Sequence, residues 1–167
     1  MTIGKHSDIA KTGSDISAQV SVGNYTTVGP HVQMHTLHQH ACIGDRSLVS
    51  TYPMRFPGYP KTFGEEHITI GSDVWIGRNA TLLGNITIGH GAIIGAFSVV
   101  AKDIPPYAVV VGNPAVIKRY RCTPDQIEQL LKIQWWSWDD QTLFERRDDF
   151  QDISQFVKKW SSDTIAL

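Results

Sequence analysis

Three histidines crowd into the seven residues "MHTLHQH", at positions 35, 38 and 40. An imidazole titrates near neutral pH and can take a proton from a reacting hydroxyl or amine, and its neutral form also binds zinc. The four other histidines, His6, His31, His67 and His90, are scattered along the chain. The crowded segment is therefore the first place to look for chemistry, either as a general base or as a zinc ligand.

The elements that must position these histidines follow a period of six. Residues 70–105 divide into IGSDVW, IGRNAT, LLGNIT, IGHGAI, IGAFSV and VAKDIP. Neither the spacing of a helix nor the alternation of a strand fits that period, but a solenoid of short strands and turns does. Three sixes would close one triangular coil of roughly 18 residues. Each six begins with an aliphatic residue that we expect to face the core: Ile70, Ile76, Leu82, Ile88, Ile94 and Val100.

The N-terminal part repeats this period less regularly. Ile3, Ile9, Ile16, Val22, Val28 and Met34 stand six apart, with a single spacing of seven. The register then breaks in "MHTLHQHACIGDRS", which holds the three histidines. The packing of regular coils therefore does not account for the residue types in this segment.

An irregular stretch, "STYPMRFPGYPKTFGEEH", follows at residues 50–67. Excursions of this length from a compact fold are uncommon and are more often functional than idle. Its four aromatic residues argue against disorder, so we predict an ordered loop that projects from the coils. Tyr52 and Phe56 are candidates to contact a substrate ring.

The C-terminal part changes character. Thr123, Pro124 and Gln126 form a capping-box pattern that predicts the start of a helix. Its apolar stripe is Ile127, Leu130, Leu131 and Gln134, and we expect the tryptophans at 135, 136, 138 and 160 to be packing residues. The predicted organisation is a mostly β solenoid over residues 1–112 and a turn with a helical cap over 113–167. We expect the helices to cover the open end of the solenoid.

Composition narrows the function classes. The formal net charge of −1 gives no reason to expect a nucleic acid or an acidic membrane as partner. Cys42 and Cys122 stand alone without a CxxC pair, which favours reduced thiols in a cytoplasmic protein. The N-terminus lacks the apolar run of a secretory signal, and no apolar stretch is long enough to span a membrane.

Several motifs in order resemble a known family. "STYP", "DVWIG", "KDIPPYAVVVGNPA" and "WW" are similar to the hexapeptide-repeat acyltransferases, and most similar to the xenobiotic acetyltransferase branch. That branch includes type B chloramphenicol and streptogramin acetyltransferases and many sugar O-acetyltransferases. The resemblance implies a left-handed parallel β-helix, a homotrimer, and acetyl-CoA bound in a cleft between neighbouring solenoids.

The resemblance also implies site residues. Family members carry their catalytic base shortly before "STYP", which points to His40, then His38, then His35, although the family's spacing is not fully matched here. Zinc is the alternative, but spacings of three and two do not reproduce ligands that come from different coils, and we expect no metal. The implied acetyl-CoA contacts are Trp75, Gly77, Gly95, Ala96, Ser98, Lys102, Asn113, Pro114, Lys118 and Arg119, with Arg121 completing a basic patch for phosphate.

The sequence thus predicts an acetyltransferase in which a histidine deprotonates an acceptor that attacks acetyl-CoA directly. Neither cysteine lies in a setting typical of a nucleophile, which argues against an acyl-enzyme. We expect the acceptor to be a sugar or polysaccharide precursor. A hydroxylated antibiotic is the alternative acceptor, and a non-catalytic solenoid scaffold is the alternative function.

Overall fold

Short strands stack into three sheets whose neighbouring strands run parallel, except for one antiparallel pair at the end of the second sheet. The computed structural model describes residues 1–10, 13–16, 19–35 and 67–161. Sheet A contains β1 (Thr2–Ile3), β4 (Gln19–Val22), β7 (His67–Ile70) and β10 (Ile86–Ile88). Sheet B contains β2 (Asp8–Ile9), β5 (Thr27–Val28), β8 (Trp75–Ile76), β11 (Ile93–Ile94), β13 (Ala108–Val111) and β14 (Val116–Tyr120). Sheet C contains β3 (Asp15–Ile16), β6 (Gln33–His35), β9 (Thr81–Leu83) and β12 (Val99–Val100).

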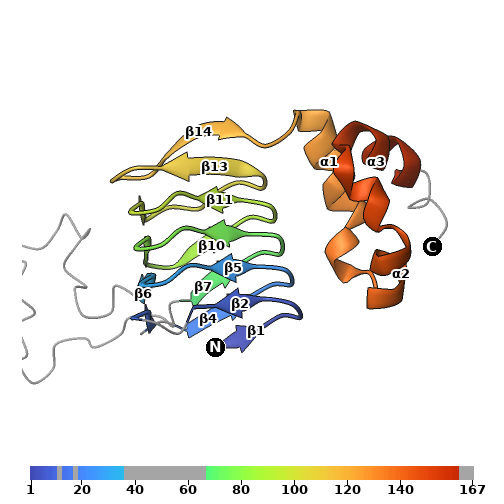
Figure 1. Ribbon diagram of the computed structural model, residues 1–167. Helices are drawn as coiled ribbons and strands as arrows, with labels where there is room; N and C mark the ends of the chain where they lie inside the picture. The colour runs from blue at the N-terminus through green and yellow to red at the C-terminus, as the bar shows by residue number, and fades with distance from the viewer. Residues whose placement is uncertain (11–12, 17–18, 36–66, 162–167) are drawn as a thin grey trace, which may run out of the picture.

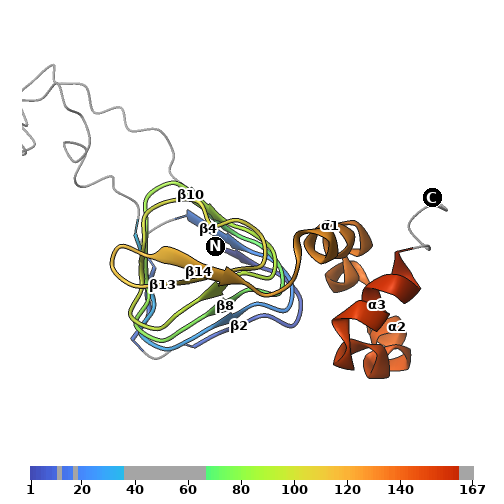
Figure 2. The ribbon, with the colours of Figure 1, turned by 90° about the horizontal axis from the view of Figure 1, so that it is seen from above.

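The chain visits the three sheets in turn, and each circuit forms one coil (Figure 1). Seen from above, the coils superpose as a triangle (Figure 2). Ile70 pairs with Ile88, and Ile76 with Ile94, so successive coils are in register at the spacing predicted from the sequence. All six aliphatic residues predicted to face the core are buried. This confirms the parallel β architecture.

Left-handed backbone conformations recur where sheet A turns into sheet B. This corner, called corner AB below, stacks residues with φ between about 53° and 70°: His6, Tyr25, Asp73, Gly91 and Tyr107. Backbone hydrogen bonds join the coils there, as from Asp73 N to Asn24 O at 2.9 Å. Because left-handed backbone turns the chain sharply, the side chains at this corner form a vertical row that a neighbouring element can cover.

The predicted capping box begins the first helix. Thr123 accepts a hydrogen bond on Oγ1 from Gln126 N at 3.3 Å, and Gln126 Oε1 accepts one from Thr123 N at 3.0 Å. The elements that follow the cap are α1 (Pro124–Ile133), η2 (Trp135–Ser137), α2 (Asp140–Glu145), η3 (Arg147–Gln151) and α3 (Ile153–Trp160). Together they are called the helical appendage. Gln134, predicted to lie on the apolar stripe, instead ends α1 in a left-handed conformation.

Aromatic side chains hold the helical appendage together, as predicted. Trp138 packs against Phe156 and against Trp160, with ring centroids 5.8 and 5.5 Å apart. The guanidinium of Arg146 lies 4.5 Å from the Trp138 ring and 3.7 Å from the Trp160 ring. A cation between two indoles is attracted by both ring faces, which ties α2 to α3.

The helical appendage lies beside corner AB and not over the end of the coils, where the sequence suggested it would pack (Figures 1 and 2). Trp136 stacks on His90 with ring centroids 4.6 Å apart, and its carbonyl accepts a hydrogen bond from Asn24 Nδ2 at 3.0 Å. Lower down, His6 Nε2 lies 2.9 Å from Asp140 Oδ1. At the end of the coils, β14 folds back antiparallel onto β13. The division at residue 112 stays a prediction.

Trp136 is the main apolar anchor of the helical appendage, with 6% of its surface exposed. Replacing it with alanine should cost about 3 kcal/mol, because both the stacking on His90 and the buried ring are lost. We expect proteolysis within residues 124–160 to accelerate while the coils stay protected. Phe144→Ala removes an aromatic ring that is 65% exposed, so it should leave proteolysis nearly unchanged. Equal effects from the two variants would contradict this role of Trp136.

His90 should make stability depend on pH. Its Nδ1 accepts a hydrogen bond from Ser72 N at 2.8 Å, and burial lowers the pKa of the ring below its usual value of 6.5. As the pH falls, the unfolded chain therefore binds a proton before the folded chain does. The contribution of His90 to the free energy of unfolding is fully present above about pH 6.5, and it is lost as the pH falls from there through the lower pKa of the folded state. Urea unfolding at several pH values checks this.

The His90→Asn variant should flatten that dependence, because an amide oxygen accepts the same hydrogen bond without titrating. His31→Asn changes an exposed corner histidine and should keep the dependence. An unchanged pH dependence in His90→Asn would assign the effect to another group.

Within the residues the structure describes, no helix is both long and apolar enough to cross a membrane.

Candidate functional site

The predicted base segment begins at the end of β6. His35 is half-buried there, opposite Leu83, and its carbonyl accepts a hydrogen bond from Gly84 N at 3.0 Å. His38, His40, Tyr52 and Phe56 lie outside the described residues. Their roles stay predictions.

His67 reaches the same corner of the coils, and the sequence did not single it out. It begins β7, directly after the irregular stretch, and its Nε2 lies 2.8 Å from Ser21 Oγ. Its backbone N–H donates to Asn85 Oδ1 at 3.3 Å. His35 and His67 are therefore the last and first described residues on either side of the segment 36–66. Position in the chain was the available signal, since both border the break in register.

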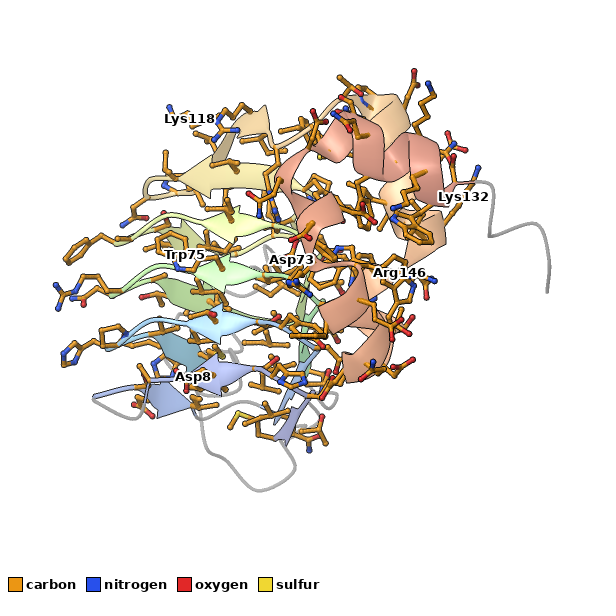
Figure 3. All side chains as sticks on the ribbon, turned by 45° about the vertical axis from the view of Figure 1, so that its right-hand side comes forward. Asp8, Asp73, Trp75, Lys118, Lys132 and Arg146 are labelled. Carbon is orange, nitrogen blue, oxygen red and sulfur yellow. The ribbon has the colours of Figure 1, made fainter. Side chains whose placement is uncertain are left out.

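Trp75 lies on the outer face of sheet B (Figure 3). It is 47% exposed, although it belongs to a strand in the middle of the sheet. Thr27 and Ile93 flank it on the neighbouring coils. A large ring held on a rigid strand gives this face a flat apolar surface, which suits the alkyl part of a ligand or a second chain.

Gly77 and Gly95, which were predicted to contact acetyl-CoA, are also required by the packing of the coils. A Cβ on Gly77 would lie 2.5 Å from Ala96 N, and one on Gly95 would lie 2.6 Å from Val111 Cγ1. The next coil therefore occupies the space that a side chain would need. Ala96 is exposed at the turn after sheet B. Of these three residues, only Ala96 has a side chain that faces solvent.

The structure does not support the expectation that the Ser98 side chain contacts acetyl-CoA. The residue is fully buried, and its Oγ accepts a hydrogen bond from Gly112 N at 3.2 Å. A side chain enclosed in this way cannot touch a ligand outside the coils. Its contact is with the turn that carries Asn113 and Pro114.

That turn and the strand after it are open to solvent. Asn113 and Pro114 are exposed and joined by a cis peptide bond. Lys118 and Arg119 are exposed on β14, where Lys118 projects from the end of the coils (Figure 3), and Lys102 is exposed on the coil below. Exposed cationic groups near a solvent-facing turn can pair with phosphate oxygens.

Arg121 does not belong to this basic surface. Its Nη1 lies 2.8 Å from Asp73 Oδ2 and donates to Gly91 O at 2.7 Å, and its guanidinium lies over the Tyr107 ring. Burial raises the pKa of Asp73 despite the neighbouring Arg121. Asp73 lies at the side of the coils nearest the helices (Figure 3), so this ion pair fixes the strand-to-helix connection at corner AB.

Metal binding was the alternative for the histidines. Within the described part of the chain, no three histidine, cysteine or carboxylate side chains come close enough together to hold a metal ion. His38, His40 and Cys42 lie outside that part.

Comparison with known proteins identifies relatives for these coils. Residues 67–102, which run from β7 past β12, match the bacterial transferase hexapeptide family (six repeats). A chloramphenicol acetyltransferase of Klebsiella aerogenes is 52% identical over 69 residues, which cover 41% of this chain and 33% of that protein. A probable macrolide acetyltransferase of Lysinibacillus sphaericus is 46% identical over 76 residues, which cover 46% of this chain and 42% of that protein. The chain thus spans about a third of the length of the first of these relatives.

Solved structures give matches over more of the chain. A hexapeptide-repeat acetyltransferase from Vibrio cholerae, solved in complex with acetyl coenzyme A, matches with a TM-score of 0.57 and 28% identity. The match covers 72% of this chain and 60% of that one. The polysialic-acid-specific acetyltransferase NeuO matches with a TM-score of 0.53 and 26% identity, over 74% of this chain and 54% of that one.

Proposed function

We propose that this chain is a hexapeptide-repeat acyltransferase, and that it transfers an acetyl group from acetyl-CoA to a hydroxyl or amine of a small acceptor. The observation that carries the proposal is the match of these coils to a hexapeptide-repeat acetyltransferase solved with acetyl-CoA. The exposed Trp75, the Asn113–Pro114 turn and the cations of β14 agree with it.

In the proposed assembly, three left-handed solenoids pack side by side and acetyl-CoA lies between two of them. Trp75 borders the acyl end, the backbone near Ala96 runs along the pantetheine, and Asn113, Pro114, Lys118 and Arg119 lie near the phosphates. Lys102 is also exposed to solvent and is a further candidate to contact the cofactor. We propose a cytoplasmic location, because two isolated cysteines favour reduced thiols over a disulfide framework.

In the proposed reaction, one histidine among His40, His38 and His35 takes the proton of the acceptor hydroxyl. The acceptor oxygen forms a bond with the thioester carbonyl carbon, and the carbon–sulfur bond breaks. The histidine then returns its proton to the departing thiolate, so the products are an acetyl ester and CoA. An imidazole suits both steps because its pKa lies near working pH.

For the acceptor we propose a sugar or a polysaccharide precursor, and the match to NeuO supports that class. An antibiotic hydroxyl is the second candidate. It is favoured by the 52% identity to a chloramphenicol acetyltransferase.

The direct test is release of free thiol from acetyl-CoA by the purified protein. We expect release only when an acceptor is added, with a panel of nucleotide sugars and oligosaccharides compared with chloramphenicol and a macrolide. Light scattering should give the mass of a trimer. Absence of CoA binding in calorimetry would contradict the proposal and favour a scaffold, and a strictly monomeric protein would contradict the cleft between chains.

A further inference from the structure

The fully buried hydroxyl of Ser98 has no counterpart in the two coils directly below it. One coil earlier the equivalent position is Ala80, and another coil earlier it is Val32, both buried. All three lie at the turn from sheet B to sheet C. In the first coil the equivalent position is Ser14, but that residue is only half-buried, and its Oγ donates to Ala10 O at 3.0 Å, four residues earlier in its own coil. A hydroxyl enclosed among apolar side chains costs free energy unless it is hydrogen-bonded. Its presence in this coil therefore needs a specific reason.

The reason lies in where the regular coils end. In the lower coils, the first strand residue of sheet C donates its N–H to the corner carbonyl of the next coil, as Gln33 does to Ala80 and Thr81 does to Ser98. Val99 donates in the same way to Gly112 O at 2.9 Å. Gly112 thus takes the place of a corner residue, but the chain then turns back into β14 instead of continuing into sheet C.

That reversal changes the hydrogen bonds of the turn. In regular corners, the N–H of Ala80 or Ser98 is bonded within its own turn, to Gly77 O or Gly95 O at 3.3 Å. The N–H of Gly112 is bonded across coils to Ser98 Oγ. Ala115 N then donates to Val99 O at 2.8 Å, so three contacts from Ser98 and Val99 hold both ends of the segment 112–115.

We propose that Ser98 is a positioning residue for the cofactor: it fixes the Gly112–Ala115 turn so that Asn113 and Pro114 face the bound acetyl-CoA. This inference rests on the proposed function. Gly112 has φ of 105°, a conformation that only glycine adopts readily, so its backbone is set by the surroundings and not by a side chain of its own. The Ser98 hydroxyl is the side chain that supplies this constraint.

Two measurements on Ser98→Ala test the inference. The amide of Gly112 should exchange its hydrogen at least about fivefold faster than in the wild type, because its acceptor is lost. The dissociation constant for CoA, measured by calorimetry, should rise about five- to tenfold, while kcat at saturating acetyl-CoA stays within about twofold. Ser98→Thr keeps the hydroxyl and should restore both values.

Thr26→Val is the matched control. Thr26 is also a fully buried hydroxyl at a corner of the coils, where Oγ1 donates to Gly71 O at 2.9 Å, but it lies far from the turn. It should lose comparable stability without any change in CoA affinity. If it weakens CoA binding as much as Ser98→Ala does, the effect is general loosening and the inference fails.

The failure of this inference differs from the failure of the proposed function. Wild-type protein that does not bind CoA would overturn the function, and the positioning role with it. Wild-type binding together with unchanged Gly112 exchange or unchanged CoA affinity in Ser98→Ala would overturn the positioning role alone.

Discussion

Gly77→Ala is expected to destabilise the fold by about 4 kcal/mol or more, which is a large part of the stability of an ordinary domain. The added Cβ would meet three backbone atoms of the next coil, the closest being Ala96 N at 2.5 Å. Those atoms cannot retreat easily, because Gly77 N donates to Ile94 O at 2.8 Å and sets the distance between the coils. Urea unfolding followed by circular dichroism measures the loss.

Thr69→Ala provides the control for this variant. Thr69 is exposed on β7 in an adjacent sheet, and its side chain points away from the core. We expect a change below about 1 kcal/mol. If Gly77→Ala unfolds at the urea concentration of the wild type, the coils are not packed as closely as described.

The coil architecture was predictable because the same pattern of residue types repeats every six positions. Each six places one aliphatic residue in the core, and pairs such as Ile76 and Ile94 follow from adding 18 to a residue number. The start of α1 was predictable for a similar reason, because Thr123 and Gln126 cap the helix within four residues. Interactions confined to a short window leave a pattern in the sequence.

Long-range packing left no such pattern. Trp136 stacks on His90, which is 46 residues earlier, and nothing local to either residue specifies the partner. The predicted packing role of the tryptophans was therefore correct, but their position beside corner AB was not foreseeable. Arg121 illustrates the same point, because its sequence neighbours suggested a basic surface while Asp73 recruits it into an ion pair.

The candidate site was predictable by residue type more than by orientation. Trp75 is exposed, as a ligand contact requires, and the cations of β14 face solvent. Ser98 points inward because its coil position faces the core, and only the backbone of Gly112 explains the hydroxyl. Coil position decides which side chains can reach a ligand.

The largest catalytic effect is expected from the histidine segment. Among the single variants His40→Ala, His38→Ala and His35→Ala, one should lower kcat by about 10²- to 10⁴-fold, because an acceptor hydroxyl then lacks its general base. We expect that variant to be His40→Ala. CoA affinity should be unchanged in calorimetry, since the base acts on the acceptor and not on the cofactor.

His31→Asn is the matched control, because it removes an exposed histidine only four residues before His35 and asparagine tolerates the left-handed backbone found there. Its kcat should stay within about twofold of the wild type. Full activity in all three alanine variants would place the base elsewhere, and His67, which follows the same segment in the chain and has Ser21 as its partner, would be the next group to replace. Stoichiometric zinc in elemental analysis would instead assign the three histidines to a metal.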